Sequence, residues 1–92
     1  MTTNLTWRVS PNDVDAALET LREAAGVAHD RCVSLKVQGL KKWPADAQKL
    51  LVCVEDAARL FADEEHGEAI HRLARQLTRE GRHAGVVMEI QW

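Results

Sequence analysis

The segment Leu50-Leu51-Val52-Cys53-Val54-Glu55-Asp56 decides the fold. Its first five residues are apolar without interruption, and the run stops abruptly at two acids. A continuous apolar run of strand length is typical of a central strand in a parallel sheet, because such a strand is buried on both faces. We therefore expect residues 50–54 to form the central strand of a parallel sheet.

One further strand is predicted before this segment and one after it. Residues 4–9 and residues 86–92 show the period-two alternation of a strand. If the apolar residues of all three strands turn the same way, one face of the sheet carries Leu5, Trp7, Val9, Leu50, Val52, Val54, Val86, Met88, Ile90 and Trp92. We expect this face to meet the helices.

The segment after the first strand predicts a long helix. Ser10-Pro11-Asn12-Asp13 is a helix start in which Ser10 caps and Pro11 takes the first helical position, and Gly39 is the expected C-terminal cap. Apolar residues recur between them in steps of four and three: Val14, Leu18, Leu21, Ala25, Ala28, Cys32 and Leu35. A coiled-coil seam has the same spacing, but the share of Ala and Cys in this stripe favours packing against a sheet.

The second half of the chain predicts a connection and two more helical pieces. Pro44 cannot continue a helix, and we expect Trp43 beside it to cover the end of the core rather than to stack on a ligand. Residues 57–62 are a short helical piece. Asp63-Glu64-Glu65 could cap and charge the start of a second long helix, which Gly81 ends. Its apolar face is formed by Ala69, Ile70, Leu73, Ala74 and Leu77.

The order strand–helix–strand–helix–strand predicts the fold class. Helix-length crossovers imply parallel strands, and two right-handed crossovers in one direction place both helices on the same face of the sheet. We expect a two-layer α/β unit with a three-stranded parallel sheet in the order 1-2-3. Residues 1–92 would form a single domain.

The composition excludes several classes of function. The 92 residues carry 12 Lys and Arg against 14 Asp and Glu, a net charge of −2, so the chain is not polybasic overall. No apolar run approaches the roughly 20 residues of a membrane span. Only two cysteines occur, Cys32 and Cys53, and with no signal-peptide pattern they indicate reduced thiols in the cytoplasm.

The face of the sheet turned away from the helices is a candidate protein interface. It would carry the apolar strip of Leu51, Cys53 and Val87, next to Glu89. A parallel sheet is rarely left uncovered on one face, so the strip predicts self-association, with a homodimer as the expected form, or contact with another protein. The alternative is that the termini or loops of the chain cover it.

The second half of the chain resembles the motor domain of FtsK/SpoIIIE-type DNA translocases. Leu51 to Leu60 resembles the Walker B strand with its acidic pair, and Gly81-Arg82-His83-Ala84-Gly85-Val86 resembles the Gly-Arg stretch that opens the next strand. The resemblance implies a partial RecA-like, Rossmann-like fold. It also implies a setting in DNA translocation, such as a regulator of a motor protein on a mobile element.

The chain departs from that family at the catalytic elements. The acidic pair is reversed, with Glu55 in the place of the metal-associated Asp and Asp56 in that of the catalytic Glu. No Gly-x-x-x-x-Gly-Lys-Ser/Thr occurs, so no phosphate-binding loop is present in the sequence. We therefore predict no catalytic residue, no cofactor and no metal site, and we expect a protein that is not an enzyme.

Two sets of charged residues remain as candidate sites. Glu55 and Asp56 form a degenerate Walker B-like pair that could bind a nucleotide; alternatively, Asp56 caps the next helix and Glu55 is solvated. The second set is the arginine row of Arg72, Arg75, Arg79 and Arg82. It could contact nucleic acid or an acidic partner, or it could be a solvated face on which Glu68 pairs with Arg72.

Three functions follow, in order of preference. The first is a non-catalytic interaction or regulatory module, which acts by self-association or by contact with a motor-type protein. The second is a nucleic-acid-binding accessory protein that uses the arginine row on DNA. The third is a degenerate nucleotide binder that uses Glu55 and Asp56.

Overall fold

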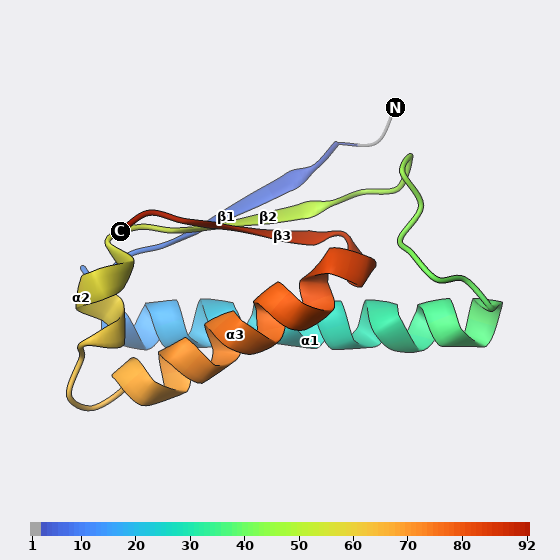
Figure 1. Ribbon diagram of the computed structural model, residues 1–92. Coiled ribbons are helices and arrows are strands. Elements are labelled where there is room, and N and C mark those ends of the chain that lie inside the picture. Colours follow the sequence, from blue (N-terminus) through green and yellow to red (C-terminus); the bar gives the residue numbers. More distant parts are fainter. Residues whose placement is uncertain (1–2) are drawn as a thin grey trace.

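The fold is a three-stranded parallel sheet with its helices on one face (Figure 1). The computed structural model describes residues 3–92. The strand order is β1-β2-β3, which confirms residues 50–54 as the central strand and the helices as crossovers on the same side. The elements are β1 (Leu5–Val9), α1 (Val14–Gln38), β2 (Leu50–Val54), α2 (Ala57–Phe61), α3 (Gly67–Ala84) and β3 (Val86–Ile90).

The core lies between the sheet and the two long helices. Val52 is paired with Trp7 on one side and Met88 on the other, and Leu50, Val52 and Val54 are at most 1% exposed. The predicted apolar stripe of α1 is part of this core. This confirms that the helix packs against the sheet and does not form a coiled coil. Each fully buried side chain of this size contributes about 1.5–3 kcal/mol. Within residues 3–92, no helix has the length and apolar character needed to cross a membrane.

The start of α1 differs from the prediction. The helix begins at Val14, and Asp13 is its N-cap, with a carboxylate that accepts a hydrogen bond from the Ala16 amide at 3.0 Å. Ser10 instead accepts a hydrogen bond from Asn12 at 3.4 Å in the preceding turn. Ser10 as the cap and Pro11 as the first helical residue were therefore wrong, because Asp is an equally strong cap and directly precedes the apolar stripe. Gly39 is confirmed as the C-terminal cap, with a φ of 71°.

The end of α3 also differs from the prediction. Gly81 does not end the helix; it lies inside α3, and Gly85 caps the helix with a φ of 67°. A Cβ on Gly81 would overlap the carbonyl oxygen of Val86, so glycine is needed there for the close approach of helix and strand. Asp63 does not cap α3, whose N-cap position is taken by His66; it accepts hydrogen bonds from the amides of Glu65 and His66 in the turn before the helix.

Trp43 lies at the junction between α3 and β3. Its indole N–H donates to the Gln48 carbonyl at 2.8 Å, and its ring lies against Gly85. The Arg31 guanidinium lies 4.4 Å from the ring centroid and donates to the carbonyls of Ala84 and Gly85 at 3.1 and 3.3 Å. Burial lowers the pKa of Arg31 below its ordinary value. Arg31 thus ties α1 to the junction between α3 and β3.

Two glycines inside helices are expected to respond in opposite directions to alanine. Gly81→Ala forces α3 away from Val86 and should lower the free energy of unfolding by about 2 kcal/mol. Gly26→Ala meets no atom within 4 Å on an exposed part of α1 and should raise it by about 0.5–1 kcal/mol. Urea denaturation followed by circular dichroism measures both changes. If the two substitutions change the free energy of unfolding equally, the close approach of α3 to Val86 at Gly81 is contradicted.

Candidate functional site

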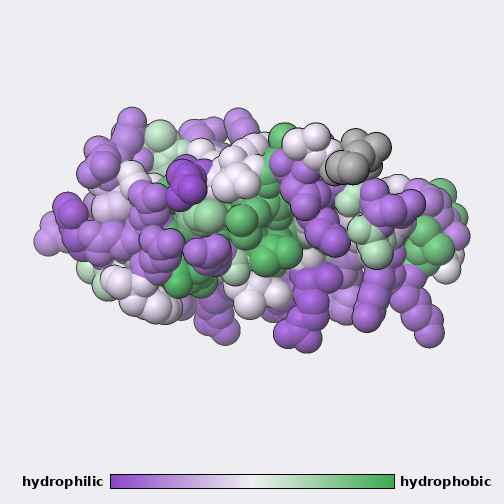
Figure 2. Space-filling view, turned by 90° about the horizontal axis from the view of Figure 1, so that it is seen from above, coloured by the Kyte–Doolittle hydropathy of each residue, from purple (hydrophilic) through white to green (hydrophobic). Residues whose placement is uncertain are grey.

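The sheet face opposite the helices is not covered by any element of residues 3–92. Seen from above, this face shows a central apolar patch with hydrophilic side chains around it (Figure 2). The strand register arranges its side chains in two rows. We call this surface the open face; it consists of Thr6, Leu51 and Val87 in one row and Arg8, Cys53 and Glu89 in the next.

The apolar residues of the open face are unequally exposed. Val87 is 51% exposed and Leu51 is partly exposed, whereas Cys53 is only 4% exposed. The expectation that Cys53 contributes to the exposed strip was therefore wrong. Cys53 lies on the central strand between Arg8 and Glu89, and side chains on both sides of a central strand enclose its own. A partner at this face would contact Leu51 and Val87 before it reached the sulfur.

The two edges of the open face carry opposite charges. Arg8 on β1 lies 3.4 Å from the Glu55 carboxylate; the Arg8 side chain is 66% exposed and the Glu55 side chain 41% exposed. Glu89 on β3 accepts a hydrogen bond from the Gln91 amide at 3.3 Å. Exposed ion pairs contribute only about 0–1 kcal/mol, so Arg8 and Glu89 can exchange these partners for others at little cost.

The acidic pair after β2 is held by arginines. Asp56 accepts a hydrogen bond from Arg59 at 3.3 Å, as Glu55 does from Arg8. Asp56 is the N-cap residue of α2, in line with the alternative interpretation, but its side chain makes no capping hydrogen bond. Its main-chain carbonyl accepts from the amides of Arg59 and Leu60 instead. Within residues 3–92 no group of three metal-ligating side chains converges here or elsewhere, and a cation at this pair would have to displace an arginine.

The arginine row is exposed along α3, but its members have different surroundings. Glu68 lies 4.0 Å from Arg72, at the limit of the predicted ion pair. Arg75, Arg79 and Arg82 line a cavity of about 440 Å³ together with the apolar side chains of Phe61, Ile90 and Trp92. Three arginines thus border an apolar surface, a feature that helix periodicity alone does not reveal.

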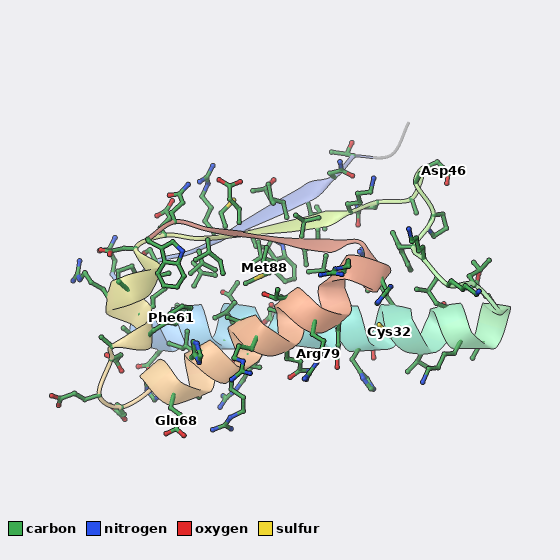
Figure 3. The ribbon with its side chains drawn as sticks, viewed as in Figure 1. Cys32, Asp46, Phe61, Glu68, Arg79 and Met88 are labelled. Atoms are coloured by element: carbon green, nitrogen blue, oxygen red, sulfur yellow. The ribbon has the colours of Figure 1, made fainter. Side chains whose placement is uncertain are left out.

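A second cavity of about 530 Å³ runs along β3 and shares Thr78, Arg82 and Ile90 with the first. It is also lined by Trp43, Leu77 and Met88, with Lys42 and Lys49 at its border. We call the two cavities together the β3 groove. Figure 3 shows Phe61 and Met88 below β3, with Arg79 projecting from α3. The sequence analysis missed this groove, because its walls come from four separate segments of the chain.

Asp56 has a strained backbone, which a substitution can test. Its φ of 51° makes it the only non-glycine residue of residues 3–92 in the left-handed region. This conformation is unfavourable for L-residues, so Asp56→Gly should raise the free energy of unfolding by about 0.5–1 kcal/mol. The matched control Asp46→Gly, at an exposed loop position, should leave stability unchanged or slightly lower. A loss of stability in Asp56→Gly would show that the ion pair with Arg59 outweighs the backbone strain.

Comparison of the chain with known protein families, with curated proteins and with solved structures finds no match. Function is therefore inferred from the geometry of the described residues.

Proposed function

We propose that the protein is a non-catalytic interaction module that forms a homodimer through the open face. The observation that carries the proposal is a parallel sheet with helices on one face only and an apolar patch at the centre of the other. Strands of parallel sheets are nearly always covered on both faces. A second copy of the sheet supplies the missing layer.

The charges of the open face favour a second copy as the partner. A two-fold axis parallel to β2 places the β1 strand of one copy over the β3 strand of the other, with the sheets about 10 Å apart. Because Arg8, Cys53 and Glu89 are in register, this axis brings Arg8 of one copy opposite Glu89 of the other, twice. In the other row, Leu51 meets Leu51 of the second copy at the axis, and Val87 lies opposite Thr6.

The size of the open face implies a weak dimer. Three strands of five residues cover roughly 15 Å by 16 Å. That area is well below the about 800 Å² per partner of a standard interface. We therefore expect a dissociation constant in the high micromolar range, which suits a module that exchanges partners.

Two further statements belong to the same proposal. The resemblance to FtsK/SpoIIIE-type translocases supports a motor protein as a second occupant of the open face. The two free cysteines support a reducing cytoplasm. Nucleic-acid binding by the exposed arginine row is the second candidate function, and duplex DNA at low salt tests it directly.

Charge reversal tests the dimer. Glu89→Arg places two arginines opposite each other at both contacts and should weaken dimerisation by about tenfold or more. The double variant Arg8→Glu with Glu89→Arg restores opposite charges and should restore dimerisation of the variant with itself. Glu23→Arg makes the same charge change on the exposed part of α1 and is the matched control.

Sedimentation velocity over a range of concentrations gives the association constants. If the unsubstituted chain stays strictly monomeric at about 1 mM, the proposal is overturned. The dissociation constant would then exceed about 1 mM, which corresponds to a binding free energy weaker than about −4 kcal/mol. If the double variant does not recover dimerisation, the dimer does not have a two-fold axis parallel to β2.

A further inference from the structure

The free edge of β3 has main-chain groups that no strand of residues 3–92 satisfies. β3 is the last strand of the sheet, and β2 is its only neighbour. Gln91 donates to Val54 and accepts from Ala57, and the Gly85 carbonyl accepts from Leu50. Because residues of a parallel strand alternate in direction, Val87 and Glu89 also bond toward β2. The amide and carbonyl groups of Val86, Met88 and Ile90 therefore point away from the sheet.

Two of these three residues, Met88 and Ile90, line the β3 groove, whereas Val86 is covered. Gly81 of α3 approaches the Val86 carbonyl closely and covers it. Met88 and Ile90 line the groove and are partly exposed. The main-chain amides and carbonyls of these two residues have the spacing with which one strand of a sheet pairs with the next.

The groove beside this edge has an apolar floor and a basic border. Its apolar lining includes Phe61, Leu77, Met88, Ile90 and Trp92, and the Phe61 and Trp92 rings meet edge to face at 5.6 Å. Lys42 and Lys49 lie toward the amino end of β3, and Arg75 and Arg79 toward its carboxyl end, with Arg82 between them. No Asp or Glu of the described chain lines either cavity.

We propose that the β3 groove binds an extended peptide segment of a partner protein, apolar at its centre and acidic at both ends, as a fourth strand of the sheet. The main chain of the segment bonds to Met88 and Ile90. Alternate apolar side chains enter the groove, and the acidic ends reach the lysines and the arginines. Strand addition at a free edge combines main-chain affinity with side-chain specificity in this way.

The other occupants fit this site less well. The sugar–phosphate backbone of DNA accepts hydrogen bonds but has no donor for the Met88 and Ile90 carbonyls, and it would leave the apolar floor unfilled. A second copy of β3 would bring two basic borders together, and like charges at an interface are costly. The charged residues of this site are separate from those of the open face, since the groove runs along the β3 edge and shares only Val87 with the open face.

The probe is a fluorescein-labelled peptide, acetyl-Glu-Asp-Val-Thr-Val-Thr-Val-Asp-Glu-amide, titrated with the full chain and followed by anisotropy. We expect this peptide to bind saturably. A control peptide with lysine in place of each acidic residue should not bind. N-methylation of one alternate set of peptide amides should abolish binding, and N-methylation of the other set should not. Only the amides of an added strand that face β3 are needed for the hydrogen bonds.

Two arginines of the same helix provide a matched pair of variants. Arg79 lines the groove and Arg72 does not, although both are exposed on α3. Arg79→Glu should weaken peptide binding by about tenfold, and Arg72→Glu by less than about twofold. Amide hydrogen exchange of Met88 and Ile90 should slow when the peptide binds.

The outcomes separate this proposal from the proposed function. Arg8→Glu should weaken dimerisation and leave peptide binding intact, and Arg79→Glu should do the reverse. Absence of peptide binding up to about 1 mM, or equal sensitivity to both N-methylated sets, overturns the fourth strand. Tighter binding of labelled duplex DNA than of the peptide, weakened equally by Arg72→Glu and Arg79→Glu, would assign the arginine row to nucleic acid instead.

Discussion

The pairing of β2 on both of its edges is the constraint on which the rest of the structure depends. Parallel neighbours require crossovers, and both crossovers are right-handed, so α1 and α3 come to lie on the same face. Val52 is fully buried there, while Leu51, the next residue, is only partly covered. The topology that builds the core therefore also leaves the opposite face open.

The same topology leaves β3 at an edge and places α3 next to it. Gly81 allows the helix and the strand to approach closely, and this approach covers Val86 but not Met88 and Ile90. The open face carries charges of both signs, which suits contact between two identical copies. The β3 groove is bordered by basic residues alone, which suits an acidic partner of a different kind.

The sequence predicts best where one pattern has one physical solution. The apolar run of β2 and the Gly39 cap leave few alternatives, and both predictions were confirmed. Ser10 and Asp13 compete for the same capping role, and Gly81 and Gly85 for the same helix end, so local chemistry could not choose between them. The burial of Cys53 depends on neighbours in register, and the groove on residues far apart in sequence; neither is visible in a local pattern.

The two surfaces together determine what a dimer could do. With the axis parallel to β2, the two β3 edges lie on opposite sides of the dimer, and each keeps its groove free. A partner with two acidic segments would then engage the second groove at the effective concentration set by its linker. Binding of such a partner would also stabilise the dimer, because coupling between two binding equilibria is reciprocal. If both proposals hold, a weak open face would let a partner with two acidic segments control the dimerisation of the module.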